Sequence, residues 1–356
     1  MGFAKPIEQY LFGNLLTKMH VFMYLKDIIR GEIIMSKSKK AVIVASIFIV
    51  VGVIIAFLSI AINGFHFPNG SVDLLGMKAL PDYVKKTVQI TDDFNAIDIA
   101  GEASTDVMIK NSDNGTNYIE YYDTDGLTNH AEVVDGVLTF RCEDKRTHHP
   151  TISLGFGQDT TTVVYLADKE YESIQVTTAS GDIDYLYSHK TDSKPVFNSS
   201  YTSLKTNSGD IHIADIEANT LTVKTTSGDI SISNGSFTTK LELHASSGDI
   251  QLNRITTDQA EFYTTSGYVS ASDITANTSL SSNTTSGDID MSITAADTIS
   301  ISATSGDIDL ALASDRNYSF LADTQNGDVD IPHGANYSEY ECGVSTTSGD
   351  ISIRQK

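Results

Sequence analysis

Basic residues are scarce in this chain of 356 residues. It has 24 lysines and arginines and 46 aspartates and glutamates, which gives a formal net charge of −22. The imbalance lies after residue 62: residues 1–62 carry 7 basic and 3 acidic side chains, and the rest of the chain carries 17 and 43. An acidic body repels phosphate groups, so nucleic acid is not expected as a partner.

Cysteine is nearly absent as well, with one residue toward each end of the acidic body. Cys142 continues the apolar alternation of Leu138 and Phe140, and Cys342 occupies an apolar position of the repeat described below. The body should be roughly 40 Å long, given strand spacings of about 4.8 Å, whereas disulfide-bonded cysteines need Cα atoms within about 7 Å. We expect two buried free thiols.

Recognisable catalytic patterns are also missing. The sequence has no paired-histidine metal motif and no phosphate-binding glycine loop, and the histidines after residue 100 are scattered: His130, His148, His149, His189, His212, His244 and His333. A glycosidase needs two carboxyls in unlike environments, whereas the carboxylates here recur at equivalent positions. We expect no catalytic residues and no metal ligands, and a glycan-cleaving β-helix enzyme is the least favoured alternative.

What the sequence does contain is one short pattern, Thr-Thr-Ser-Gly-Asp-Ile at residues 225–230, that recurs at intervals of 19 to 28 residues. The turn positions that it defines are Gly181, Asp182, Gly209, Asp210, Gly228, Asp229, Gly248, Asp249, Gly267, Gly287, Asp288, Gly306, Asp307, Gly327, Asp328, Gly349 and Asp350. A fixed period near 20 residues indicates a solenoid, in which each repeat packs only on its neighbours.

Apolar residues alternate with polar ones on both sides of each turn, as Val223, Ile230 and Ile232 do around Gly228. This alternation predicts two short strands per coil, each with one buried face. The predicted fold is all-β: a parallel β-solenoid, or β-helix, of about 20-residue coils, preceded by one transmembrane helix. A threonine or alanine three residues before each glycine should let the two sheets close on each other.

The turn itself predicts two further features. The glycine should adopt a positive φ, and the aspartates should form a column with a spacing of about 4.8 Å. Either each aspartate caps backbone N–H groups of its own turn or the next, or the column binds calcium. We favour capping, because the known calcium-binding β-roll repeat is glycine-rich and much shorter; calcium is the one cofactor left open.

The N-terminal part of the chain predicts a membrane anchor. Residues 41–62 carry no charged side chain, follow Lys37, Lys39 and Lys40, and are long enough to span a bilayer with the N-terminus in the cytoplasm. A signal peptide is the alternative. In the cytoplasmic segment 1–40, either Met35 is the true start and 1–34 are a mis-called extension, or 1–34 form a short amphipathic helix.

After the anchor, we predict three parts. Residues 63–87 form a linker, 88–170 an N-terminal cap with irregular first coils, and 171–356 the regular solenoid. Terminal coils of solenoids are atypical because they cover an exposed core. At the other end, Arg354 and Lys356 should blunt the open edge of the last coil by their charge.

Two aromatic residues near the turns, Tyr263 and Tyr268, are candidate ligand contacts, and Tyr268 replaces the turn aspartate. Outward positions elsewhere are mostly serine and threonine, which suit extended polymers such as glycans. The alternative is that both tyrosines are simply solvated.

The Ser-Gly-Asp-Ile turns at 180–183, 208–211, 227–230, 247–250, 286–289, 305–308 and 348–351 resemble the bacterial putative-adhesin family of β-strand repeats. This domain of unknown function includes LiaG-like membrane-anchored proteins of Gram-positive bacteria. The resemblance covers Val88 to the C-terminus and departs at Tyr268 and Asn326. It implies an extracytoplasmic β-solenoid without established catalytic residues, often encoded beside envelope-stress genes.

We therefore expect a single-pass cell-membrane protein whose extracellular solenoid is a non-catalytic binding or adhesion module of the cell envelope. Its partners would be the membrane and a cell-wall or host glycan or protein. The alternative is an envelope-stress-associated protein with a membrane-protein partner.

Overall fold

The computed structural model describes residues 83–101, 105–145, 160–186, 198–313, 315–333 and 338–355. The chain divides into two compact units, residues 1–69 and 70–356, and every described residue belongs to the second. None of the described residues forms a helix that could cross a membrane. The predicted span 41–62, Met35, His148, His149 and His189 lie outside the described residues.

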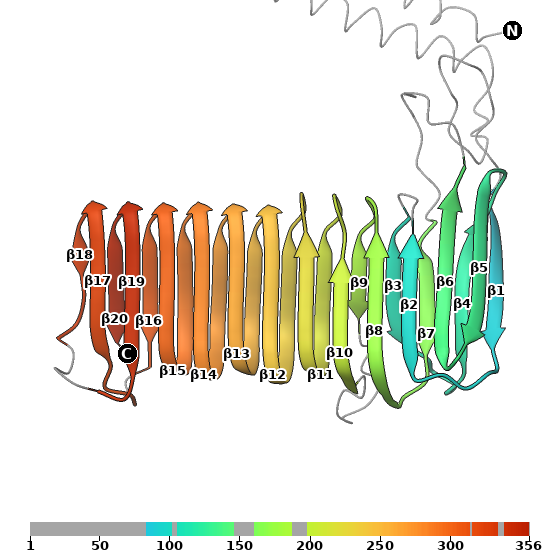
Figure 1. The fold of residues 1–356 in the computed structure, drawn as a ribbon, viewed down its shortest axis with the longest axis horizontal. Helices are drawn as coiled ribbons and strands as arrows, with labels where there is room; N and C mark the ends of the chain where they lie inside the picture. Colours follow the sequence, from blue (N-terminus) through green and yellow to red (C-terminus); the bar gives the residue numbers. More distant parts are fainter. Residues whose placement is uncertain are drawn as a thin grey trace, which may run out of the picture. The chain divides into compact units, whose positions relative to one another are not determined.

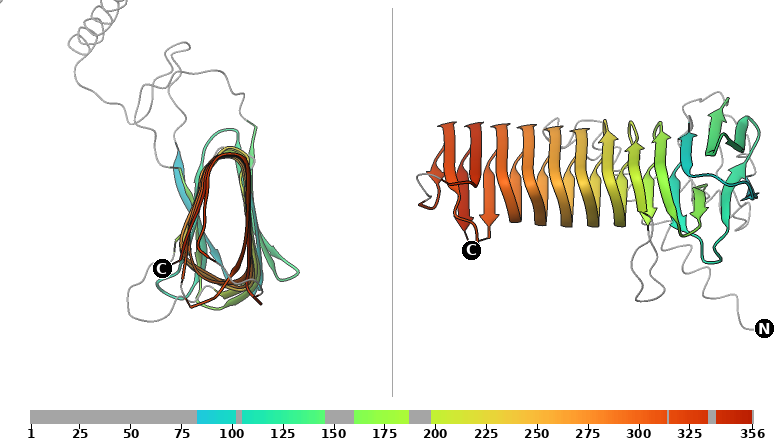
Figure 2. Two further views of the ribbon diagram at one scale, coloured as in Figure 1. Left: turned by 90° about the vertical axis from the view of Figure 1, so that its left-hand side faces the viewer. Right: turned by 60° about the horizontal axis from the view of Figure 1, so that its bottom comes forward.

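The described chain is all-β, and its strands stack as successive coils of a solenoid, as Figures 1 and 2 show. The irregular N-terminal strands are β1 (Val84–Ile90), β2 (Ala96–Gly101), β3 (Val107–Asn111), β4 (Asn117–Asp123), β5 (Leu127–Val134), β6 (Val137–Asp144), β7 (Thr162–Leu166), β8 (Glu170–Thr178), β9 (Ile183–Leu186) and β10 (Asn198–Lys205). The regular coils follow as β11 (Ile211–Thr225), β12 (Ile230–Ser247), β13 (Ile250–Ser266), β14 (Val269–Ser286) and β15 (Ile289–Ser305). The last strands are β16 (Ile308–Leu312), β17 (Ser319–Asn326), β18 (Val329–Asp330), β19 (Glu341–Ser348) and β20 (Ile351–Gln355). β1 begins at Val84, inside the stretch predicted as a linker.

The regular coils pair in parallel with equivalent repeat positions opposite each other, so Ile230 lies beside Ile211 on one side and Ile250 on the other. The prediction of two short strands per coil was too simple. Each coil from β11 to β15 is one strand of 15 to 18 residues that bends partway. In four coils, a residue six positions after the glycine has a positive φ of 54° to 58°: Asp215, Asn234, Arg254 and Asp273.

The core is a continuous stack of apolar side chains inside the coils. Equivalent residues such as Ile230, Ile250, Val269, Ile289 and Ile308 are all at most 1% exposed. Burial at matching positions stabilises the parallel register, because a one-residue slip would expose this whole row of side chains to water. Both cysteines are buried and neither forms a disulfide, as predicted, and burial raises the pKa of the Cys342 thiol to about 12.

At the N-terminal end, the coil that comes first in sequence is not the outermost one. β2 pairs in parallel with both β6 and β8, and β3 pairs with both β7 and β9, so this coil is inserted between two later ones. Beyond it, the pairs β1–β4, β4–β7 and β5–β6 are antiparallel. These antiparallel strands form the atypical end that a solenoid cap requires.

The C-terminal end repeats this arrangement and corrects one prediction. β19 pairs with β15 and β17, and β20 pairs with β16 and β18, so the last coil in sequence is interior. Arg354 therefore does not blunt an edge: its guanidinium donates to both carboxylate oxygens of Asp309, at 2.7 and 2.6 Å. Lys356 lies outside the described residues.

The outer position of β17 and β18 has a physical cause in the sequence. Pro332 follows β18 at a position where the inner coils continue as strand, and proline has no N–H to donate to a neighbouring strand. The coil that contains it is therefore best placed at the edge. The last coil has the stronger apolar set, with Val344, Ile351 and Ile353 at most 3% exposed, and gains more from being covered on both sides.

Candidate binding surface

The turn aspartates form a hydrogen-bonded ladder along the solenoid. The backbone N–H of Asp210 donates to Oδ1 of Asp182, that of Asp229 to Asp210, and that of Asp249 to Asp229, each at 2.8 Å. Each carboxylate thus caps the turn of the adjacent coil, which is the geometry of the capping hypothesis. Among the described residues, no group of three or more His, Cys, Asp or Glu has the arrangement of a metal site.

The turn glycines share a close contact rather than a common φ. Only Gly287, Gly306 and Gly349 among them have a φ in the left-handed range, between 146° and 152°, so the general prediction of positive φ was wrong. A Cβ on any turn glycine would lie 1.9 to 2.1 Å from a backbone carbonyl oxygen of the neighbouring coil. Glycine is therefore required because the coils touch backbone to backbone at this corner.

At several turns, the threonine before the glycine does more than let the sheets close. Thr225 donates its hydroxyl to the carbonyl of Gly209 at 3.3 Å, and Thr264 donates to Gly248 at 3.1 Å. Thr346 donates to Gly306 at 3.2 Å. These threonine side chains are at most 5% exposed, so a buried hydroxyl finds its hydrogen-bond partner in a turn carbonyl of a neighbouring coil. Sequence reasoning saw the small size but missed this bond.

The two candidate ligand contacts, Tyr263 and Tyr268, lie on opposite sides of the Gly267 turn and do not form one site. The N–H of Tyr268 still donates to Oδ1 of Asp249, at 2.8 Å, but its side chain offers no carboxylate to the next coil. Burial, together with the charge of Asp290 and a hydrogen bond to it from β15 of the next coil, raises the pKa of the Tyr268 hydroxyl. Tyr268 is thus held against the molecule.

Tyr263, by contrast, is 42% exposed and belongs to a straight row of outward side chains across the strands before the turn. Strand pairing places the members of this row directly beside one another: Lys205, Lys224, His244, Tyr263, Asn283, Ser302 and Ser345. We call it the turn-side row. Adjacent members are about 4.8 Å apart, the spacing of paired strands. Most of the row's C-terminal half is hydroxyl or amide, and its N-terminal half is cationic and aromatic.

A network of ion pairs lies beside this row. Glu242 accepts from Lys224 and Lys240, both at 3.4 Å, and Lys240 also reaches Glu261 at 2.8 Å. Nε2 of His244 lies 2.9 Å from Glu242, and its ring lies 5.8 Å from that of Tyr263. Partial burial tends to raise the pKa of Glu242, but the hydrogen bonds from His244 and Lys240 and the nearby lysine charges outweigh it and lower the pKa.

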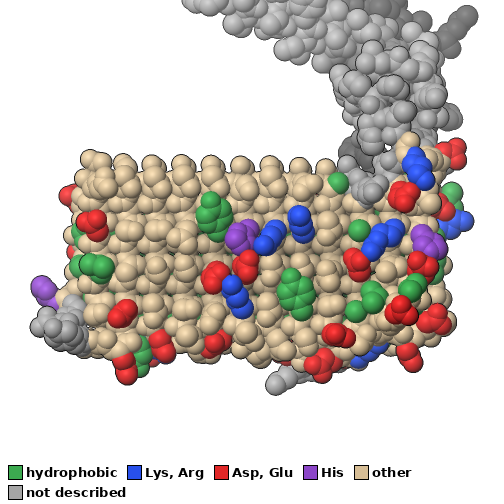
Figure 3. Space-filling view, viewed as in Figure 1, with side chains coloured by type: hydrophobic (Ala, Val, Ile, Leu, Met, Phe, Trp, Pro, Cys, Tyr) green, Lys and Arg blue, Asp and Glu red, His purple; other side chains and the backbone are tan. Residues whose placement is uncertain are grey.

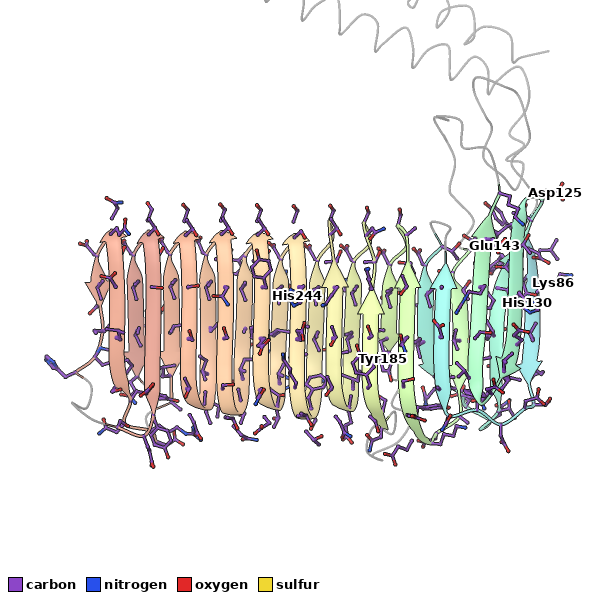
Figure 4. All side chains as sticks on the ribbon, viewed as in Figure 1. Lys86, Asp125, His130, Glu143, Tyr185 and His244 are labelled. Carbon is purple, nitrogen blue, oxygen red and sulfur yellow. The ribbon has the colours of Figure 1, made fainter. Side chains whose placement is uncertain are left out.

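Together with Tyr201, which is 38% exposed, these side chains make one patch on a wall that is otherwise lined by hydroxyl and amide side chains between β10 and β15. Figure 3 shows this flat wall from outside, and Figure 4 labels His244 on it, away from Lys86 and His130 at the N-terminal cap. We call it the charged-aromatic patch, with members Tyr201, Lys205, Lys224, Lys240, Glu242, His244, Glu261 and Tyr263. Sequence reasoning found only Tyr263. The available signal was the Lys-Lys-His-Tyr succession four residues before four consecutive turn glycines.

These features define a class: an all-β solenoid of stacked coils that presents a flat, polar face. Residues 94–354, more than half of the chain, match the model of the family described as Toastrack DUF4097, and the chain belongs to this family. The resemblance to a putative-adhesin repeat domain of unknown function is thereby confirmed.

Comparisons with individual proteins give weaker similarities. No match was found among curated proteins. Of the solved structures, a "putative adhesin" from Parabacteroides distasonis is 14% identical, with a TM-score of 0.47, over 76% of this chain and 97% of that one. A "putative adhesin" from Bacteroides fragilis is 14% identical, with a TM-score of 0.40, over 77% and 97%. A "putative lipid binding protein" from P. distasonis is 18% identical, with a TM-score of 0.37, over 76% and 96%. We assign no ligand from these similarities.

Proposed function

We propose that this protein is a non-catalytic binding module that a single membrane anchor displays on the bacterial cell surface, where its solenoid adheres to an extended glycan. The observation that carries the proposal is the charged-aromatic patch. Repetition serves folding, and on the strands before the turns, from β10 to β15, this patch is where the outward side chains depart from hydroxyls and amides. Exposed aromatic rings on a flat polar face suit stacking against sugar rings.

The membrane-protein partner of the alternative hypothesis would favour a contiguous apolar patch. The exposed large hydrophobic residues do not gather in that way. Val84 and Val134 lie on cap strands β1 and β5, and Leu321 and Val329 lie on the edge strands β17 and β18. Leu321 shares the wall of the patch tyrosines, but strands β14, β15 and β19 separate it from Tyr263 on β13. The two tyrosines are accompanied by charges rather than by other apolar side chains. This distribution favours the glycan.

Binding is tested by co-sedimentation of the full-length protein, purified in mild detergent, with cell walls with and without teichoic acids and with mucin. The Tyr201→Ala/Tyr263→Ala double variant should lose most of the binding, and Tyr122→Ala on β4 is the matched control. Each assay is run with calcium and with chelator. Equal binding by the double variant and the control would show that the charged-aromatic patch is not the binding site.

Surface display is tested separately on intact cells. The support for it is the uncharged stretch 41–62 with three lysines before it. External protease should cleave the segment that follows the span and release the solenoid. Retention of the whole chain on intact cells, with cleavage only after lysis, would contradict display.

A further inference from the structure

The lysines of the regular solenoid are gathered in one place. Lys205, Lys224 and Lys240 are the only lysines between residues 198 and 355, and all three belong to the charged-aromatic patch. They lie on β10, β11 and β12, which are consecutive in the stack. In a body with a large acidic excess, three neighbouring ammonium groups on one wall are a distinct feature.

The charges of the patch do not cancel. Glu242 and Glu261 are engaged by Lys224 and Lys240, whereas Lys205 is exposed and forms no ion pair with any described residue. Three ammonium groups against two carboxylates leave a positive surplus at the Lys205 end. Carboxylates elsewhere on the body act weakly at this point, because the screening length is about 8 Å at physiological salt.

The surplus charge and the aromatic ring lie on one line. Lys205, Lys224, His244 and Tyr263 succeed each other along the turn-side row, so Tyr263 stands three coil steps, roughly 14 Å, from Lys205. The row then continues with the amide of Asn283 and the hydroxyl of Ser302, whose Oγ donates to Oδ1 of Asn283 at 2.6 Å. Cations, a ring and hydrogen-bonding groups therefore follow in order along the solenoid axis.

We propose that the turn-side row binds a linear anionic polysaccharide that lies along the solenoid axis. Its acid groups contact Lys205 and Lys224, a sugar ring stacks on Tyr263, and its hydroxyls bond to Asn283 and Ser302. This inference rests on the proposed function and narrows it to one ligand class. Between β10 and β15 the wall exposes no large aliphatic side chain, which suits a polymer laid across it better than a lipid surface. The exposed ring of Tyr263 distinguishes sugars from a simple polyanion.

The test measures affinity of the full-length protein, by biolayer interferometry, for four probes. These are alginate, which is a linear uronate polymer, neutral dextran, poly-L-glutamate, and vesicles of phosphatidylglycerol and phosphatidylcholine. Alginate should bind at least about tenfold more tightly than dextran or poly-L-glutamate, since only alginate offers both charge and rings. Raising the salt concentration should weaken alginate binding, because exposed charge pairs are screened.

Variants locate the contacts. Lys205→Ala and Lys224→Ala should each lower the affinity for alginate about two- to fivefold, as expected for exposed ion pairs. Tyr263→Ala should lower it about fivefold or more. Lys86→Ala, on the exposed strand β1 of the cap, is the matched control and should leave the affinity unchanged.

Each contrary outcome has a defined meaning. Equal binding of dextran and alginate overturns the anionic class and leaves the proposed function intact. Poly-L-glutamate binding as tightly as alginate, or vesicle binding that Lys205→Ala abolishes while alginate does not bind, overturns the polysaccharide in favour of another anion. Failure of all four probes, together with failure of cell walls and mucin, overturns both proposals.

Discussion

Replacing one turn glycine tests how the coils are held together. In Gly248→Ala, the new Cβ would lie 1.9 Å from the carbonyl oxygen of Gly228, and no real Cβ contact is shorter than about 3.0 Å. The two turns must therefore separate locally by about 1.1 Å, the difference between these two distances. The contact is with backbone, so no side-chain rotation can relieve it.

Three hydrogen bonds would be stretched by this separation. They run from Ser247 N–H to the Thr226 carbonyl at 2.9 Å, from Ile230 N–H to the Asp249 carbonyl at 2.9 Å, and from Asp249 N–H to Asp229 Oδ1 at 2.8 Å. Each would exceed hydrogen-bonding distance. At about 0.5–1.5 kcal/mol for each bond, the free energy of unfolding should fall by about 1.5–4.5 kcal/mol.

The assay is urea unfolding of the full-length protein, followed by far-ultraviolet circular dichroism and by hydrogen exchange of the affected coils. Gly343→Ala is the matched control, because a Cβ there would meet only the carbonyl of Ile299 at 3.8 Å. The control should change the unfolding free energy by less than about 0.5 kcal/mol. If both variants unfold at the same urea concentration, close coil contact is not the reason for the glycines.

Three further predictions concern the ladder, the patch and the C-terminal coil. Asp229→Ala should cost about 1–2 kcal/mol in urea unfolding, because it removes the acceptor for the Asp249 amide, whereas Asp229→Asn keeps an acceptor oxygen and should cost less. The pKa of Glu242 is lower in the folded protein than in the unfolded chain, so its carboxylate stabilises the fold at pH values above the unfolded pKa. This stabilisation is lost as the pH falls through the pKa of the folded state. Glu242→Gln should therefore reduce the loss of unfolding free energy on acidification below about pH 4.5. Deleting residues 338–356 should abolish hydrogen-exchange protection of β17 and β18, because β19 and β20 are their described strand partners; full protection after the deletion would contradict the inserted order of coils.

Much of the fold could be predicted from the sequence because the determinants are local and repeated. Alternating apolar residues around each glycine identify the inward face, and the near-constant interval between turns fixes the length of a coil. The capping role proposed for the aspartates matches the observed ladder, because a short carboxylate beside a tight turn can reach only a few N–H groups. The reason for the glycines was missed, since it depends on how closely two coils approach.

The patch shows why a site is harder to predict than a fold. Lys205, Lys224, His244 and Tyr263 are separated along the chain by 19 or 20 residues, and only the register of four paired strands brings them into one row. From the sequence, Tyr263 and Tyr268 were both candidate ligand contacts near the same turn. The turn between them directs one ring to solvent on the wall and the other against Asp290.

The sequence by itself determined the repeat, the inward face and the parallel stacking, because each follows from side-chain alternation with a fixed period. Only the tertiary structure decided the order of the coils at both ends. Adjacent repeats offer nearly equivalent pairing partners, so the choice rests on small differences in burial and hydrogen bonding summed over a whole coil. Pro332 and the weaker apolar set of its coil place β17 and β18 outside, and the last coil is covered on both sides.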